Sequence, residues 1–209
     1  MSDNVRVTRE DSTTTITLAR PEKRNALSAA MMTDLTAALA EAGASDTLAV
    51  VIAADGPVFS AGHNFGDLAR ADLRAARELF LLCTTMMDTV QGIPQPVIAK
   101  VHALATAAGC QLVASCDLAI AADTAGFALP GGKGGLFCHT PLVAVSRNVG
   151  RKRALEMALT GDVIDAAINL HNGTHGSIGQ LARTTVRAID QTSAEYLLSL
   201  DVADRPGVL

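Results

Sequence analysis

The chain has 209 residues, a hydrophobic fraction of 49% and a formal net charge of −4, which fits one domain with a sizeable core. Because it has no basic run and only 3% aromatic residues, it lacks the cationic patches and stacking platforms of nucleic-acid-binding proteins. No apolar run reaches the length that is needed to cross a bilayer.

The beginning of the chain shows no targeting pattern. Residues 1–11 contain neither an apolar run nor a basic amphipathic pattern, so they do not resemble an export or transit peptide. The four cysteines lie in apolar or small-residue contexts without the spacing of metal ligands, which is typical of reduced structural thiols. These features predict a cytoplasmic protein without a metal site.

The first half of the chain alternates between strand and helix patterns. Residues 5–9 and 14–18 are rich in β-branched side chains and predict a hairpin. A helix capped at its first residue is expected over residues 28–42, and the apolar run of residues 48–53 predicts a buried parallel strand. A long helix is expected over residues 72–90, with inward side chains at Leu73, Leu79, Leu82 and Met86.

The second half continues this alternation. A buried strand is expected over residues 96–101, followed by a short helix that begins at Ala107. The remaining predicted elements are strands over residues 118–122 and 127–129 and helices over residues 140–149 and 151–160. Strands that alternate with helices in this way indicate an α/β fold.

Two tight turns of small residues are the features that most suggest a functional site. One covers residues 59–63 and the other residues 105–109, and each follows a buried strand and opens a helix. Turns of this kind can aim two backbone N–H groups at one point, which is how an oxyanion hole is built. The pattern depends on backbone geometry rather than on any particular side chain.

Several short motifs occur in a fixed order between residues 5 and 166. They cover residues 20–27, 59–62, 107–112, 116–117, 154–157 and 159–161. In this order and spacing the chain resembles the crotonase family of enoyl-CoA hydratases and isomerases, and residues 105–117 and 135–138 are most similar to one divergent branch of it. The resemblance implies an α/β, crotonase-like spiral of ββα units that is C-terminally truncated.

The resemblance also implies a substrate. Family members hold the carbonyl of an acyl-CoA thioester between two backbone amides, so coenzyme A enters as part of the substrate and no separate cofactor is expected. By position, the donors here are the N–H groups of His63 and Ala108. The other expected substrate-binding residues are Ala61, Gly62 and Gly109 in the two turns, and Lys23, Arg24 and Ala26 in a basic turn that could also be merely solvated.

Hydratases of this family use two glutamates for acid–base chemistry, and both are replaced here, by Gln111 and by Gly131. An amide can orient a water but cannot take its proton, and glycine offers no group, so hydration should be slow. Restoring both carboxylates as Gln111→Glu and Gly131→Glu is expected to raise the rate. His63 and His139 are candidate replacement groups, because an imidazole can titrate near neutrality. The simpler interpretation of each is a loop histidine with a solvent or backbone partner.

The crotonase pattern is not seen in the last part of the chain. Residues 165–209 resemble instead the passage of homoserine dehydrogenase that leads into its ACT domain. We therefore expect a crotonase-like acyl-CoA-binding domain over residues 1–166 and a foreign or atypical tail over residues 167–209. The tail is expected to pack poorly, with partial docking of a helix over residues 178–189 and a strand over residues 196–202 that lacks partner strands.

The sequence leaves three functional hypotheses open. The chain is an enoyl-CoA hydratase-like lyase of fatty-acid metabolism, a catalytically weak acyl-CoA-binding relative, or an inactive hybrid product. The resemblance further implies a homo-oligomer, either a trimer or a hexamer. Nothing in the sequence indicates a nucleic-acid or membrane partner.

Overall fold

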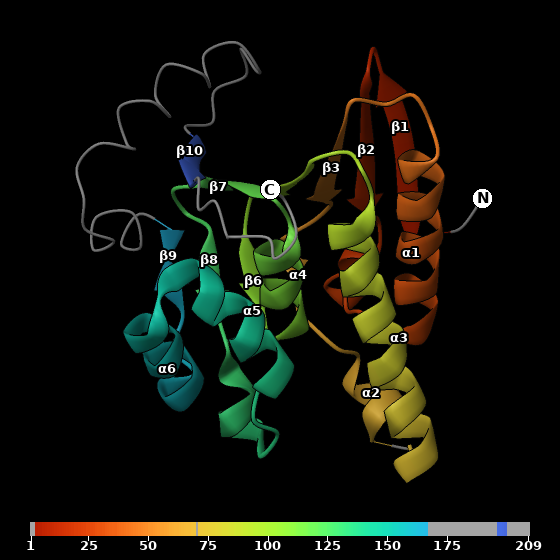
Figure 1. Cartoon of the computed structure of the whole chain (residues 1–209). Coiled ribbons are helices and arrows are strands. Elements are labelled where there is room, and N and C mark those ends of the chain that lie inside the picture. The colour runs from red at the N-terminus through yellow and green to blue at the C-terminus, as the bar shows by residue number, and fades with distance from the viewer. Residues whose placement is uncertain (1–2, 70, 167–195, 200–209) are drawn as a thin grey trace, which may run out of the picture.

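The computed structural model describes residues 3–69, 71–166 and 196–199, which form two sheets and a set of helices (Figure 1). The six-stranded sheet contains, in spatial order, β1 (Val5–Glu10), β2 (Thr13–Leu18), β3 (Ala49–Ala54), β5 (Val97–Val101), β7 (Leu118–Ala122) and β10 (Tyr196–Ser199). The four-stranded sheet contains β4 (Val58–Ser60), β6 (Leu104–Thr106), β8 (Gly126–Ala128) and β9 (Ile164–Asp165).

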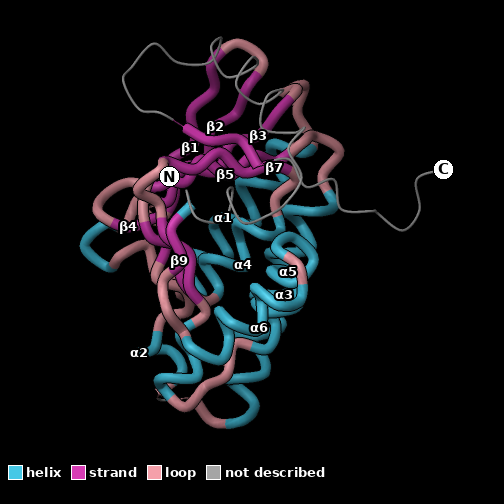
Figure 2. The backbone as a smooth tube through the Cα atoms, turned by 90° about the vertical axis from the view of Figure 1, so that its left-hand side faces the viewer, coloured by secondary structure: helices cyan, strands magenta, loops and turns pink. Residues whose placement is uncertain are grey.

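The helices lie mostly to one side of the strands, as Figure 2 shows. They are α1 (Ala29–Gly43), α2 (Phe65–Leu68), α3 (Leu73–Gly92), α4 (Ala108–Ser115), α5 (His139–Val149) and α6 (Arg151–Thr160), with 3₁₀ turns at Pro21–Lys23 and Pro130–Gly134. No helix in the described part of the chain is long and apolar enough to span a membrane.

The predicted spiral of ββα units is confirmed by how consecutive strands are shared between the sheets. In each of the pairs β3–β4, β5–β6 and β7–β8, the first strand joins the six-stranded sheet and the second joins the four-stranded sheet. Helices follow each pair: α2 and α3 after the first, α4 after the second and, beyond a 3₁₀ turn, α5 after the third. Strands β2, β3, β5 and β7 pair in parallel. The continuous apolar sequence of β3 fits this arrangement, because parallel strands are normally covered on both faces.

The predicted hairpin and first helix are also confirmed. Strands β1 and β2 pair antiparallel, with Val5 opposite Leu18. The Ser28 hydroxyl accepts a hydrogen bond from the Met31 amide at 3.2 Å, which satisfies one of the free N–H groups at the start of α1.

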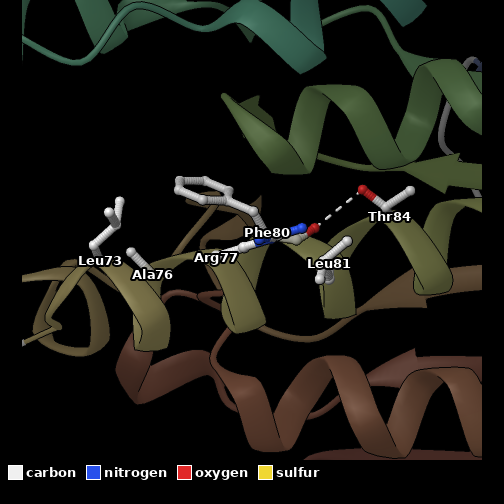
Figure 3. A pocket seen from close by; sticks show the side chains of 6 residues that line it. All are labelled: Leu73, Ala76, Arg77, Phe80, Leu81 and Thr84. Carbon is white, nitrogen blue, oxygen red and sulfur yellow. Dashed lines mark hydrogen bonds between the residues drawn. The ribbon is translucent and has the colours of Figure 1, made fainter.

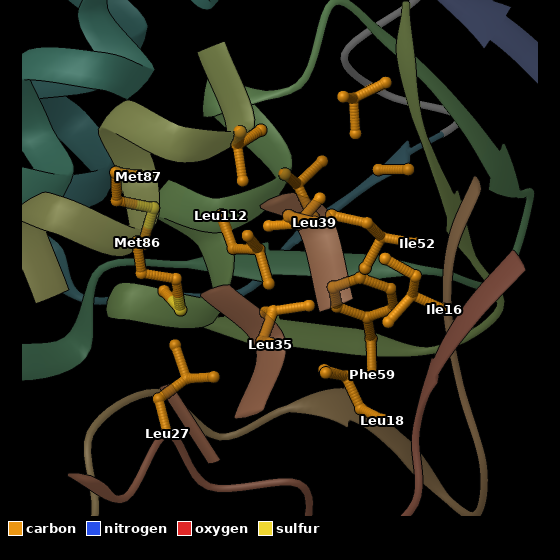
Figure 4. Close-up of a cluster of buried hydrophobic side chains, with 14 of the residues drawn as sticks. Ile16, Leu18, Leu27, Leu35, Leu39, Ile52, Phe59, Met86, Met87 and Leu112 are labelled. Atoms are coloured by element: carbon orange, nitrogen blue, oxygen red, sulfur yellow. The ribbon is translucent and has the colours of Figure 1, made fainter. Parts of the chain in front are cut away.

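The core is aliphatic, which explains how the chain manages with few aromatic residues (Figure 4). Phe59 is the one aromatic side chain among the largest fully buried residues of the described chain. Around it gather Ile16, Leu18, Leu35, Leu39, Ile52, Met86 and Leu112. Since α1, α4 and the six-stranded sheet all contribute, this core fixes the start of α4 relative to β4.

The prediction that Leu73 lies in the core is wrong. Leu73 is 87% exposed, whereas Leu79 and Met86 are 7% and 0% exposed, as predicted. Leu73 is the first residue of α3, and the buried side chains of that helix begin only at Leu79. The helical pattern identified the right face but not the point at which that face meets the rest of the molecule.

The strand expected over residues 196–202 was predicted to lack partner strands, but it has a partner strand in the six-stranded sheet. Residues Tyr196–Ser199 form β10, which pairs antiparallel with β7 and places Leu198 opposite Ile120. The edge of β7 supplies the backbone hydrogen bonds that an isolated strand would lack. The predicted helix over residues 178–189 and the remainder of the tail lie outside the described residues.

Candidate functional site

The turn after β4 is held so that a single N–H group stays free. The amides of Ala61 and Asn64 donate to backbone carbonyls within residues 24–27, at 3.0 and 3.4 Å. The amide of Gly62 donates to a serine hydroxyl of the same turn at 3.3 Å. Of the four consecutive N–H groups from residue 61 to residue 64, only that of His63 donates to no described residue.

Two buried polar residues, which the sequence analysis overlooked, hold this turn in place. The Asn25 side chain accepts from the Arg20 amide at 2.9 Å and donates to the carbonyls of Asp55 and Val58 at 2.8 and 3.1 Å. The Ser60 hydroxyl donates to the Asn25 carbonyl at 2.8 Å. Both Asn25 and Ser60 are 0% exposed, and such fully paired buried groups fix one backbone conformation.

The second turn, which opens α4, is strained at one residue. Ala107 has φ 49° and ψ −120°, a conformation that residues other than glycine rarely adopt and that recurs at functional sites. Its amide donates to the Ala128 carbonyl at 2.9 Å, and its own carbonyl accepts from the Gln111 amide at 3.0 Å. The next N–H group, that of Ala108, begins the helix and donates to no described residue.

The two turns touch, and glycine makes the contact possible. A Cβ placed on Gly62 would lie 3.0 Å from the Ala108 nitrogen and 2.8 Å from the Thr106 oxygen, and the φ of Gly62 is +79°. A Cβ on Gly109 would lie 2.6 Å from the Ser60 oxygen. The structure therefore brings the two predicted turns together, with their free N–H groups on adjoining segments.

Two buried side-chain atoms at these turns have no hydrogen-bond partner. They are Nδ1 of His63 and Oε1 of Gln111, and Gln111 is 8% exposed. In the described part of the chain only one other buried side-chain atom shares this property, Oε1 of Gln95. Unpaired buried polar atoms are rare in folded proteins, so their concentration at the two turns marks the site.

The imidazole of His63 is partly buried and neutral at neutral pH. Its ring lies edge-on against Phe80, with the ring centroids 5.4 Å apart. Burial lowers the pKa of His63 from its ordinary value of 6.5, while the Leu27 backbone and the Asp67 carboxylate act in the opposite direction.

This pKa shift predicts a pH dependence of stability. Because protonation of His63 favours the unfolded state, the free energy of unfolding should fall as the pH drops below 6.5 and should stay constant above it. Urea unfolding between about pH 7 and pH 5 measures this dependence. The window lies above the ordinary pKa values of the carboxyl groups, and ion pairs lower some of those pKa values further, so the carboxyl groups contribute little to the change. His63→Gln should flatten the profile, and a flat wild-type profile would contradict the prediction.

The structure gives less support to an acid–base role for the other two predicted residues, Gly131 and His139. A Cβ on Gly131 would overlap the Leu136 carbonyl oxygen and lie 2.7 Å from the Cys138 sulfur, so no side chain fits there without a shift of the turn. His139 begins α5, is exposed, and packs edge-on against Phe137 with the ring centroids 5.1 Å apart. Among the described residues, no hydrogen bond or ring contact joins His139 to the two turns.

The basic turn presents two cations to solvent. Lys23 and Arg24 are exposed, and neither makes an ion pair with a described residue, whereas Arg20 pairs with Glu22 at 2.6 Å. The Arg24 carbonyl accepts the Ala61 amide, so this turn is joined directly to the candidate site. A free cation at this position can meet a phosphate.

An apolar hollow of about 400 Å³ lies on the face of α3 that carries Phe80 (Figure 3). It is lined by Leu73, Ala76, Arg77, Phe80, Leu81 and Thr84. Leu73, Phe80 and Leu81 are 87%, 37% and 55% exposed. One of its lining residues, Phe80, also packs against the His63 ring of the candidate site.

The cysteines offer no reactive group. All four thiols are free, and burial raises the pKa of Cys83 to about 11 and that of Cys110 to about 12. Within residues 3–69, 71–166 and 196–199 there is also no group of three or more His, Cys, Asp or Glu side chains that could hold a metal ion.

Known proteins resemble this chain in sequence and in structure. The family model described as enoyl-CoA hydratase/isomerase matches residues 8–184. The enoyl-CoA hydratase domain-containing protein 3 of Mus musculus is 44% identical over 190 residues, which is 88% of this chain and 63% of that protein. The crystal structure of a Mycobacterium smegmatis enoyl-CoA hydratase has a TM-score of 0.79 and 45% identity, covering 82% of this chain and 68% of that one. That of human enoyl-CoA hydratase domain-containing protein 3 has a TM-score of 0.79 and 42% identity, covering 88% and 75%.

These matches confirm the predicted family and its divergent branch, and they correct one prediction. The mouse, rat and human relatives are all named as mitochondrial proteins, so the prediction of a cytoplasmic protein, which relied on the composition of residues 1–11, is wrong. The matches give no support to the resemblance of residues 165–209 to homoserine dehydrogenase.

The chain spans between 54% and 63% of the length of these three relatives. By its motifs, its alternating two-sheet spiral and these similarities, the chain belongs to the enoyl-CoA hydratase/isomerase family.

Proposed function

We propose that this chain binds acyl-CoA thioesters and polarises the thioester carbonyl between the N–H groups of His63 and Ala108. The observation that carries the proposal is that the turns bearing these two donors touch, while the preceding or flanking amides of Ala61, Gly62, Asn64 and Ala107 all donate to the protein. The amides of Gly109 and Cys110, which follow Ala108 in the first turn of α4, likewise donate to no described residue. Preorganised donors of this kind stabilise negative charge on an oxygen, and each is worth about 3–4 kcal/mol in comparable sites.

The rest of the ligand has a place on the surface around the two turns. We assign the phosphates of coenzyme A to Lys23 and Arg24, beside the backbone of Ala26. The acyl chain would follow the apolar hollow on α3, because its lining residue Phe80 packs against the His63 ring. Assembly into a trimer or hexamer, as the family resemblance implies, stays a prediction.

A second candidate function is acyl-CoA binding with little turnover. Gln111 cannot take a proton, no side chain fits at Gly131 without a shift of the turn, and among the described residues His139 makes its hydrogen bond and ring contact with Phe137. These observations favour a protein that holds an acyl-CoA and stabilises an enolate-like charge over one that hydrates a double bond efficiently.

The carbonyl contact can be tested by removing the carbonyl. Calorimetry should show that butyryl-CoA binds at least about tenfold more tightly than S-butyl-CoA, a thioether of similar size without the oxygen. The infrared band of the bound thioester carbonyl should also shift to lower frequency. Equal affinities together with an unshifted band would refute the proposed donors, and free coenzyme A serves as the control for phosphate binding alone.

A further inference from the structure

We propose that the six-stranded sheet carries a second binding site, for a small oxyanion, on the face turned away from the helices. Inorganic phosphate, phosphate monoesters and small carboxylates share this chemistry. The site is a hollow of about 170 Å³, separate from the two turns and from the hollow on α3. Its lining residues come from β2, from β3 and β5, and from the positions directly after β3 and β5: Thr17, Ala53, Ala54, Asp55, Lys100 and His102.

The register of the sheet explains why a hollow forms here. Arg6 lies opposite Thr17, and Thr17 lies opposite Ala53. On β5, Ala99 pairs with the residue before Ala53, so Lys100 continues this row. The residues on either side of Thr17 and of Lys100 are fully buried in the core, so these two side chains point to the opposite face. Because Thr17 and Ala53 are short and their flanking residues are long, the row is hollow in its middle.

The hollow also lies where parallel sheets commonly hold ligands. Strands β2, β3 and β5 run parallel, and the lining residues gather at their carboxyl ends. Thr17 is the last but one residue of β2, while Asp55 and His102 directly follow β3 and β5. In open α/β sheets, ligands bind beyond the carboxyl ends of the strands.

Two lining groups can donate hydrogen bonds to an oxyanion. Lys100 is exposed, and its ammonium has three N–H donors, so it can bind an oxyanion in addition to a protein partner. Thr17 is 7% exposed, and its hydroxyl makes no hydrogen bond to another residue in the described part of the chain. A ligand oxygen would supply the acceptor that this hydroxyl lacks, and the charged donor makes the contact stronger than one between neutral groups.

The remaining polar lining groups are already engaged by the protein. The Asp55 carboxylate accepts two hydrogen bonds from the Arg6 guanidinium, at 2.9 and 3.1 Å, so its negative charge is compensated. Nε2 of His102 lies 2.7 Å from the Gly56 carbonyl oxygen, which can only accept, so this nitrogen carries a proton. The Lys100 ammonium therefore decides the sign of the ligand, and the hollow favours an anion over a cation.

A titration followed by the backbone amide signals in NMR spectra tests this site. Sodium phosphate and sodium acetate are added separately at constant ionic strength, with sodium chloride as the reference salt. We expect the amides of Lys100 and His102 to shift in a saturable way, with a dissociation constant of about 1 mM. The anion that binds more tightly shows whether the site prefers a phosphate or a carboxylate group.

Three variants assign the binding to this hollow. Lys100→Gln should weaken it at least about tenfold, because a charge-assisted contact is lost, and Thr17→Val should weaken it about two- to tenfold. Asp55→Asn keeps the size of the side chain, removes the one negative charge of the hollow and releases the Arg6 guanidinium, so it should tighten binding. Opposite effects at Lys100 and Asp55 cannot result from a general loss of structure.

Lys152→Gln is the matched control, because Lys152 is an exposed lysine of α6 that does not line the hollow, and it should leave the dissociation constant unchanged. Shifts no larger than those in chloride, or shifts confined to the amides of Lys23 and Arg24, would overturn the inference, as would a Lys100→Gln protein that binds as tightly as the unmodified chain. The titration contains no acyl-CoA, so its failure leaves the proposed function standing, and a failure of butyryl-CoA to bind leaves this inference standing.

Discussion

Replacing Gly62 by valine should weaken acyl-CoA binding at least tenfold. The backbone at Gly62 has φ +79°, and any Cβ there would press on the Thr106 oxygen and the Ala108 nitrogen at 2.8 and 3.0 Å. A β-branched side chain must therefore separate the two turns, and the two N–H groups would no longer reach one oxygen. We expect the dissociation constant of butyryl-CoA to rise at least tenfold, about the loss of one hydrogen bond to a polarised carbonyl.

Two further variants show whether the close approach of the two turns, backbone strain or the His63 side chain causes this loss of binding. Gly150 also has positive φ, +76°, but no atom lies within 4 Å of the position of its missing Cβ. Gly150→Ala therefore tests backbone strain without a close approach and should leave binding intact. His63→Ala keeps the backbone donor and should weaken binding less than Gly62→Val. If His63→Ala is the more damaging change in a folded protein, then a side chain and not the backbone makes the site.

Hydration of crotonyl-CoA by the unmodified chain should be far slower than the usual enzyme range of about 1–10³ s⁻¹. Each missing acid–base group typically costs about 10²–10⁴-fold in rate. Gln111→Glu should raise the rate, because it places a carboxylate one helical turn from the Ala108 donor, and Gln111→Met should not. The loss of absorbance of the conjugated thioester measures this. A rate within the usual range for the unmodified chain would show that another group, such as His139, supplies the base.

The structure changes the expectation for the second glutamate position. From the sequence, Gly131→Glu was expected to add to the effect of Gln111→Glu. Because the Leu136 carbonyl and the Cys138 sulfur occupy the space beside Gly131, we now expect Gly131→Glu to lower the melting temperature and to give no further gain in rate. Gly131→Ala should destabilise as well, since the first added carbon already meets these atoms. A stable double variant with additive gains would contradict this account.

Sequence patterns alone determined those parts of the molecule whose causes are local. Ser28 caps α1 because a hydroxyl just before a helix can reach its free amides, and the apolar run of residues 48–53 became β3 because a strand covered on both faces must be apolar throughout. The two turns at residues 59–63 and 105–109 were visible as small residues at strand ends. The order of these motifs also sufficed to identify the family.

The tertiary structure decided whatever depends on residues that are distant along the chain. Strands β6 and β9 have three and two residues, too few to show a period, and they exist because β8 lies between them. From the sequence, Gly131 was a position at which a glutamate could be restored, but in the structure Leu136 and Cys138 fill the space that its side chain would need. Oε1 of Gln111 is unpaired only because the fold buries it without a donor, and burial is a property of the packed molecule that no stretch of sequence carries by itself.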